Sequence, residues 1–165
     1  VIGFIKVFAI NDKYYDILID SLKFLLNRDS AVLISYVLMP NHLHLILHVP
    51  KDKSVSSFMR DFKKFTSRTI RETLEEDGLL NTKKKLIEKG GIGKYKLWMD
   101  RFDDVIVITD KVFETKVNYI HFNPVKAKLV NKITDWTYSS ARNYFLNDNS
   151  IIDLGYYTPM SGQET

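Results

Sequence analysis

The chain contains no cysteine, which excludes disulfide bonds, thiolate zinc sites and a cysteine nucleophile. Its four histidines are then the main candidate ligands for a transition metal. No apolar run approaches the roughly 18 residues of a membrane span, and no segment has the order of regions found in a signal peptide. We therefore expect a cytoplasmic protein that does not contact a membrane.

A large excess of one charge sign is also missing. Lys and Arg number 24 and Asp and Glu number 20, so the net charge of +4 permits an anionic partner without the bulk basicity of histone-like proteins. Hydrophobic residues make up 45%, enough for the core of one ordinary domain. We expect a single domain over residues 1–165, with an incomplete first strand because the sequence starts at Val1 rather than methionine.

Hydrophobic periodicity predicts the order strand, helix, strand, strand, helix, strand, helix. The predicted strands cover 1–10, 31–39, 42–49 and 104–109, and the predicted helices follow Asn11, start at Ser54 and cover 112–122. Pro124 should break or kink the last helix, and a second short helix should follow it. The segment 76–97 should be partly helical and partly loop. This order predicts an α+β fold with helices packed on one mostly antiparallel sheet.

Three histidines fall in one predicted strand, at His42, His44 and His48. The period of two puts all three on the same face, opposite a row of leucines. Two interpretations are open: the histidines face solvent, or His42 and His44 hold one divalent ion together. The second interpretation requires a third ligand from another element.

The predicted helix near the C-terminal end carries Tyr119 and Asn123, which share one side because they are four residues apart. A tyrosine beside a metal-bound phosphate can attack phosphorus and form a phosphotyrosine ester that can be resealed later. Asn123 could supply an amide ligand one turn from that tyrosine, whereas His121 points elsewhere. The alternative is that Tyr119 belongs to the core, as tyrosines of amphipathic helices usually do.

These residues occur in two motifs, MPNHLHLIL at 39–47 and NYIHFNPVKA at 118–127. Further agreement comes from 58–67, from Trp98 with 101–103, and from WTYSS at 136–140. In this order and spacing the sequence resembles the REP-associated tyrosine transposases and their insertion-sequence relatives. Those proteins are HUH single-strand endonucleases, in which two histidines flank a hydrophobic residue, here Leu43.

The resemblance implies a ferredoxin-like or RRM-like antiparallel sheet with helices packed on it. It also implies that Tyr119 is the nucleophile and that His42, His44 and Asn123 bind Mg²⁺ or Mn²⁺; histidine ligands favour manganese of these two, and zinc stays open. The implied reaction nicks and rejoins single-stranded or hairpin DNA through a 5′-phosphotyrosine. Relatives act either as homodimers that exchange the tyrosine helix or with a complete site in one chain.

Basic residues on the helix from Ser54 and after it could contact DNA phosphates beside this site. These residues are Arg60, Lys63, Lys64, Arg68, Arg71, Lys83, Lys84 and Lys85. The alternative is an ordinary solvated face. Two other functions also stay open: a non-catalytic module that binds hairpin DNA or RNA, and a structural metal-binding domain.

Overall fold

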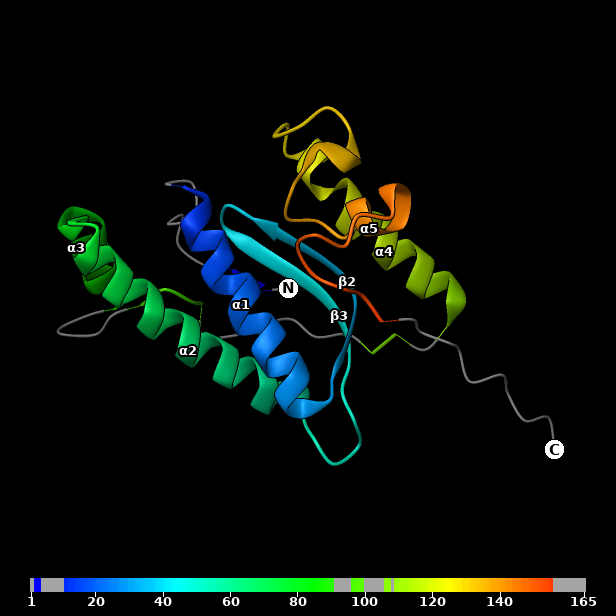
Figure 1. Cartoon of the computed structure of the whole chain (residues 1–165), viewed down its shortest axis with the longest axis horizontal. Helices are drawn as coiled ribbons and strands as arrows, with labels where there is room; N and C mark the ends of the chain where they lie inside the picture. The colour runs from blue at the N-terminus through cyan, green and yellow to red at the C-terminus, as the bar shows by residue number, and fades with distance from the viewer. Residues whose placement is uncertain (1, 4–10, 91–95, 100–105, 108, 156–165) are drawn as a thin grey trace.

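An antiparallel sheet lies between two layers of helices (Figure 1). The structure is a computed structural model that describes residues 2–3, 11–90, 96–99, 106–107 and 109–155. In chain order the elements are β1 (Ile2–Gly3), α1 (Asp12–Asp29), β2 (Val32–Met39), β3 (His42–His48), α2 (Val55–Glu76), α3 (Leu80–Gly90), α4 (Asp110–Lys126), η1 (Ile133–Asp135) and α5 (Ala141–Leu146). The predicted α+β fold with an antiparallel sheet is confirmed.

The central strand of the sheet is β3, which pairs antiparallel with β1 on one side and with β2 on the other. In the β2–β3 hairpin, Val37 lies opposite His44 and Met39 opposite His42. The pairing shifts by one residue between Leu33 and Ser35, which marks a β-bulge in β2. Because side chains alternate along a strand, the leucines of β3 face one helix layer and its histidines face the other.

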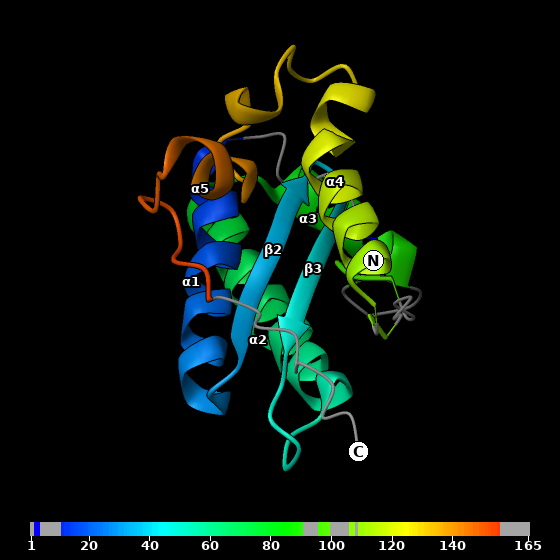
Figure 2. The same cartoon turned by 90° about the vertical axis from the view of Figure 1, so that its right-hand side faces the viewer.

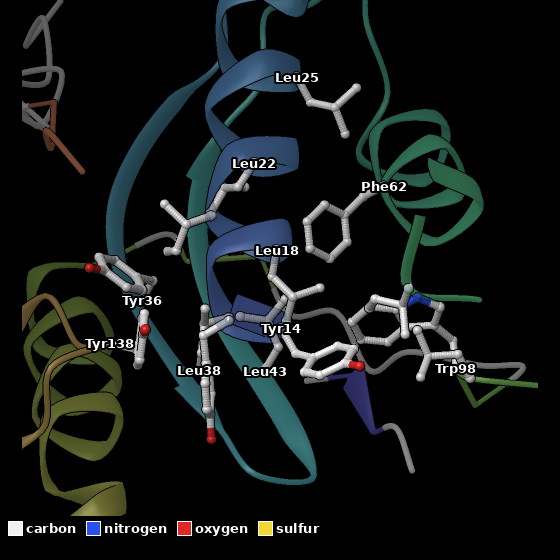
Figure 3. Close-up of a cluster of buried hydrophobic side chains, with 14 of the residues drawn as sticks. Tyr14, Leu18, Leu22, Leu25, Tyr36, Leu38, Leu43, Phe62, Trp98 and Tyr138 are labelled. Carbon is white, nitrogen blue, oxygen red and sulfur yellow. The ribbon is translucent and has the colours of Figure 1, made fainter. Parts of the chain in front are cut away.

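The larger core lies between the sheet and helices α1 and α2 (Figure 3). On α1 the buried residues Leu18, Leu22 and Leu25 recur at helical spacing, and they pack in one cluster with Phe62 of α2. Helix α2 buries one apolar stripe along its length, but its Val55 and Phe65 are exposed. Val55 is the first residue of the helix, and Phe65 lies at one edge of the stripe, where it meets Phe24 of α1 edge to face at 6.2 Å.

Helix α4 covers the opposite face of the sheet (Figure 2). Its Ile120 packs with Val37 and Met39 in a second, smaller apolar cluster. The free edge of β2 is closed by the segment 136–140, because Leu38 N donates to Tyr138 O at 2.9 Å and the Ser140 N donates to Tyr36 O at 3.0 Å. The WTYSS motif is therefore part of the framework that supports α4.

Of the break or kink predicted at Pro124, the break does not occur, because α4 continues through Pro124 to Lys126. Proline removes one N–H and crowds the carbonyl four residues earlier, but here it lies only two residues before the last residue of the helix. The next donors are satisfied: Ala127 N donates to Asn123 O at 2.9 Å, and Leu129 N donates to Pro124 O at 3.0 Å. The short helical elements that follow Pro124 are η1 and α5.

Two predicted strands lie partly outside the described residues. Of the strand over 1–10, the described pair Ile2–Gly3 joins the sheet as β1. Of the strand over 104–109, the described residues Ile106, Val107 and Thr109 belong to no strand. The predicted partly helical segment 76–97 contains α3. Within the described ranges, no helix combines the length and apolar character that a membrane crossing requires.

Candidate active site

The four residues singled out in the sequence come together within one chain, where α4 crosses the histidine face of β3. His42 and His44 point from β3 toward α4, and their ring centroids are 4.9 Å apart. From α4, Asn123 contacts both imidazoles, and the ring of Tyr119 lies 5.3 Å from that of His44. The burial of Ile120 against β2 fixes which side of α4 faces the sheet.

The Asn123 amide bridges the two imidazole rings. Its Oδ1 lies 3.2 Å from His42 Nε2, and its Nδ2 lies 3.2 Å from His44 Nε2. Asn123 and His44 are buried, with 8% and 5% of their surface exposed. A buried polar group needs a partner, and the Asn123 amide lies within hydrogen-bond reach of one nitrogen of each ring.

The same three side chains fit a divalent cation. The two imidazole Nε2 atoms and Asn123 Oδ1 are the donor types that Mn²⁺ accepts. The 3.2 Å separation of Asn123 Oδ1 from His42 Nε2 is close to the ligand spacing of about 3 Å around an ion with octahedral bonds of about 2.1 Å. In the described part of the chain, no group of three or more His, Cys, Asp or Glu side chains could hold a metal, so this candidate site depends on the Asn123 amide as its third ligand.

Burial keeps both imidazoles in the neutral form that binds a metal. Desolvation lowers the pKa of His44 to about 3, and the nearby His42 contributes in the same direction. Desolvation also lowers the pKa of His42. Neutral imidazole carries a lone pair on one ring nitrogen, so both residues are chemically ready as ligands at neutral pH.

Asn41 is a site residue that the sequence reasoning missed. Its Oδ1 lies 2.8 Å from His42 Nδ1, where it can accept the proton of that nitrogen and leave His42 Nε2 free for a metal. The signal was present in the MPNHLH motif, because Asn41 directly precedes the first histidine. Its role depends on the turn between β2 and β3, which periodicity does not describe.

Tyr119 lies at the open side of this cluster, with 45% of its surface exposed. Its ring meets the ring of His44 edge to face at 84°, and Lys126 Nζ lies 5.2 Å from its centroid. The alternative that Tyr119 belongs to the core is contradicted by this exposure. A phenol that is open to solvent and adjacent to the candidate ligands can be reached by a nucleic-acid phosphate.

The other two histidines do not join the cluster. His48 is exposed at the end of β3. His121 is buried on another side of α4, where its Nε2 lies 2.9 Å from Ser140 Oγ and 3.4 Å from Ser35 Oγ. Burial lowers the pKa of His121 to about 4. This network attaches α4 to β2 and to the residue before α5, and sequence reasoning did not find it.

The predicted basic residues lie on the other side of the molecule. They belong to α2 and α3, whereas Tyr119 and its neighbours lie between the sheet and α4 (Figure 2). Several make contacts within the chain: Arg68 Nε donates to Glu72 Oε1 at 3.0 Å, Lys83 pairs with Glu75, and Lys63 Nζ donates to Met99 O at 2.8 Å. The expectation of a basic helix beside the site is therefore wrong, because α2 uses its apolar stripe to cover the leucine face. Whether these residues bind DNA stays a prediction.

Comparison with known proteins agrees with this arrangement. A protein of Haemophilus influenzae named "Putative REP-associated tyrosine transposase" is 26% identical over 107 residues, 65% of this chain and 57% of that protein. The "REP-associated tyrosine transposase" of Escherichia coli is 28% identical over 107 residues, 64% of this chain and 52% of that protein. The chain thus spans little more than half the length of these relatives.

A solved structure, described as "Structure of the REP associates tyrosine transposase bound to a REP hairpin", has the same fold. It superposes with a TM-score of 0.67 over 99% of this chain and 88% of that chain, at 21% identity. The family described as "Transposase IS200 like" matches residues 6–123, which include His42, His44, Tyr119 and Asn123. The resemblance drawn from the two motifs is confirmed, and the chain belongs to the IS200-like transposase family.

Proposed function

We propose that this chain is an HUH-type tyrosine transposase that nicks and rejoins single-stranded DNA next to a hairpin. The observation that carries the proposal is the meeting of Tyr119 with His42, His44 and Asn123 across the interface between β3 and α4. Tyr119 is 45% exposed and lies beside three side chains that can bind a metal. A tyrosine with a purely structural role in the core would show neither feature. Family membership supports the same reaction class.

In the proposed reaction the Tyr119 hydroxyl oxygen attacks the scissile phosphorus. A phosphorus–oxygen bond to Tyr119 forms, and the bond from phosphorus to the 3′ oxygen breaks. The phenolic proton passes to solvent, and the departing 3′ oxygen takes up a proton to become a hydroxyl. The DNA 5′ phosphate is then a tyrosyl ester, and attack by another 3′-hydroxyl releases Tyr119 and joins the strands.

The chain's own residues orient these groups. His42, His44 and Asn123 would hold the divalent cation, Mg²⁺ or Mn²⁺, and Asn41 would keep the His42 Nε2 lone pair directed toward it. The bound cation would polarise a phosphoryl oxygen and offset its negative charge. Asn123 links the ligand cluster to the nucleophile, because it lies one helical turn from Tyr119.

The proposed nucleic-acid partner is a DNA hairpin with unpaired flanking bases. The solved relative is described as bound to a REP hairpin, and we carry this partner over to the present chain.

A covalent-adduct assay tests the nucleophile. Labelled hairpin DNAs from the surrounding genome are incubated with protein and Mn²⁺, and adducts are separated on denaturing gels. Wild type should form the adduct and Tyr119→Phe should not. Tyr144→Phe is a matched control, because Tyr144 is 46% exposed and lies on α5, so its adduct should persist. An adduct that persists in Tyr119→Phe would overturn the assignment.

Metal binding is tested separately by calorimetry with Mn²⁺. Asn123→Ala should weaken the affinity by roughly 10- to 100-fold, as expected when a ligand or its close support is lost. His48→Ala removes an exposed histidine of the same strand and should leave the affinity unchanged. Equal affinities in wild type and Asn123→Ala would contradict the proposed ligand set.

Chelation separates the alternatives. The proposed enzyme loses the adduct in EDTA. A non-catalytic module would bind hairpin DNA or RNA equally well with or without EDTA and form no adduct. A structural metal domain would lose much of its thermal stability in EDTA and have no affinity for DNA.

A further inference from the structure

We propose that Lys126 is a positioning residue for Tyr119, holding the phenol ring toward the cluster of His42, His44 and Asn123 through a cation–π contact. The inference rests on the proposed function, in which Tyr119 is the nucleophile. Lys126 is neither a ligand of the proposed cation nor a reacting group in the attack on phosphorus, so the proposal adds a new residue to the site.

The contact is within the normal range for this interaction. Lys126 Nζ lies 5.2 Å from the centroid of the Tyr119 ring, and cation–π pairs form within about 6 Å of a ring centroid. The ring of His44 meets the same phenol edge to face at 5.3 Å. The Tyr119 ring therefore has a cation over its ring and a buried imidazole beside it.

Such support matters because Tyr119 is half-exposed. A half-exposed side chain has little packing around it to select one rotamer, so specific contacts decide how often the hydroxyl is directed correctly. The His44 ring is fixed in turn by its burial in the central strand β3. Lys126 lies on α4, as Tyr119 does, and its contact with the phenol ring adds a second restraint on the orientation of that ring.

The path of α4 explains how Lys126 reaches the ring. Lys126 is seven residues after Tyr119, almost two full turns, so both lie on one side of the helix. Long helical side chains also lean back toward the N-terminus, which directs the Lys126 side chain toward Tyr119. A helix that ended at Pro124 would lose this alignment. The continuation of α4 through Pro124 is thus what places the ammonium group over the ring.

An ordinary structural role for Lys126 is a helix-end charge. It is the last residue of α4, where a cation interacts favourably with the helix dipole. That role predicts a change in stability when the charge is lost, and no change in the rate of attack by Tyr119. The two roles can therefore be separated by measuring rate, affinity and stability on the same variants.

The test compares Lys126→Met, Lys126→Arg and the control Lys111→Met. Lys111 is an exposed lysine in the first turn of α4, so its loss removes one charge far from the ring. At saturating hairpin and Mn²⁺, Lys126→Met should slow adduct formation about two- to five-fold, the range expected for an exposed cation–π contact. Lys126→Arg should restore the rate, and Lys111→Met should match wild type.

Hairpin affinity and Mn²⁺ affinity should stay unchanged in Lys126→Met. A loss of hairpin affinity with an unchanged rate at saturation would overturn the proposal and make Lys126 a phosphate contact. An unchanged rate together with lower thermal stability would overturn it in favour of the helix-end role.

A second measurement does not depend on activity. In protein labelled with 3-fluorotyrosine, the Tyr119 resonance is assigned by its loss in Tyr119→Phe. Its ¹⁹F shift should move in Lys126→Met and stay near the wild-type value in Lys111→Met. An absent adduct in wild type would refute the proposed function, while an unmoved Tyr119 resonance in Lys126→Met would refute the positioning role.

Discussion

The face of the sheet that α1 and α2 cover is packed with large apolar side chains, whereas the face that α4 covers combines a small apolar cluster with buried polar groups. On the first face, leucines of β3 meet the aromatic and aliphatic residues of two helices. On the second face, the buried polar residues are Ser35, His44, His121, Asn123 and Ser140. Successive side chains of β3 point alternately toward these two faces.

This difference shows how a single strand serves stability and chemistry together. Apolar burial stabilises the fold without specifying one arrangement of polar atoms. Buried polar groups contribute less net stability, but each needs a partner at a defined distance and angle. The α1 and α2 layer therefore provides most of the stability, and the α4 layer fixes the orientation of the site.

The largest effect is expected on the apolar face. Phe62→Ala should lower the free energy of unfolding by about 3 to 5 kcal/mol, because the side chain is fully buried and its removal leaves a cavity. Urea denaturation measures the change. Phe65→Ala on the same helix is the control, since Phe65 is 43% exposed and its loss should cost about 1 kcal/mol or less. Similar losses in both variants would mean that α2 does not form the main core contact.

The second-largest effect is expected at low pH, which should destabilise the packing of α4 against the sheet. Burial lowers the pKa of His44 to about 3 and that of His121 to about 4, whereas an unfolded chain has histidine pKa values near 6.5. Below pH 6.5 the unfolded state therefore binds more protons than the folded state. The free energy of unfolding is highest above that pH and falls as the pH drops toward 4.

At pH 5, the burial of each of these two imidazoles in the neutral form should lower the free energy of unfolding by up to about 2 kcal/mol relative to pH 8. Urea denaturation in EDTA at pH 8, 6.5 and 5 measures this loss in the metal-free chain. In His121→Asn the dependence on pH should be shallower. A free energy of unfolding that is equal at pH 8 and pH 5 would show that the imidazoles are not buried as neutral groups.

The serine network should have a smaller effect. Ser140 Oγ lies 2.9 Å from His121 Nε2 and 3.0 Å from Ser35 Oγ, and it accepts from Tyr36 N at 2.9 Å. Ser140→Ala therefore removes this partner from His121, Ser35 and the Tyr36 N–H. We expect a loss of about 1 to 3 kcal/mol in thermal or urea denaturation. Mn²⁺ affinity, measured at a temperature where the variant is folded, should fall as α4 loosens. Unchanged stability would argue against the attachment of α4 through Ser140.

The smallest effect is expected for the outer surface of α2. Arg68 and Glu72 form an exposed pair four residues apart, so Arg68→Gln should change stability by only about 0.3 to 0.5 kcal/mol. Hairpin affinity of the same variant at several salt concentrations tests whether Arg68 contacts DNA. A lower affinity with a shallower salt dependence would support the sequence-based prediction, and unchanged binding would contradict it.

Much of the site was predictable because it depends on two local periods. The period of two placed His42 and His44 together, and the helical period placed Tyr119 and Asn123 together. The role of Asn41 was not predictable, because it depends on the geometry of a turn. The attachment of His121 to Ser140 was not predictable either, because it joins residues on separate elements whose packing no local pattern describes.

The sequence by itself determined the α+β fold class, the histidine face of β3, the shared side of Tyr119 and Asn123, and the resemblance to the transposase family. Only the tertiary structure decided that α4 crosses the histidine face, that it continues through Pro124 to bring Lys126 over Tyr119, and that the basic helix α2 lies on the opposite face. The physical reason is that local periodicity decides which side chains share a face, whereas the pairing of faces follows from burying apolar surface across the whole chain.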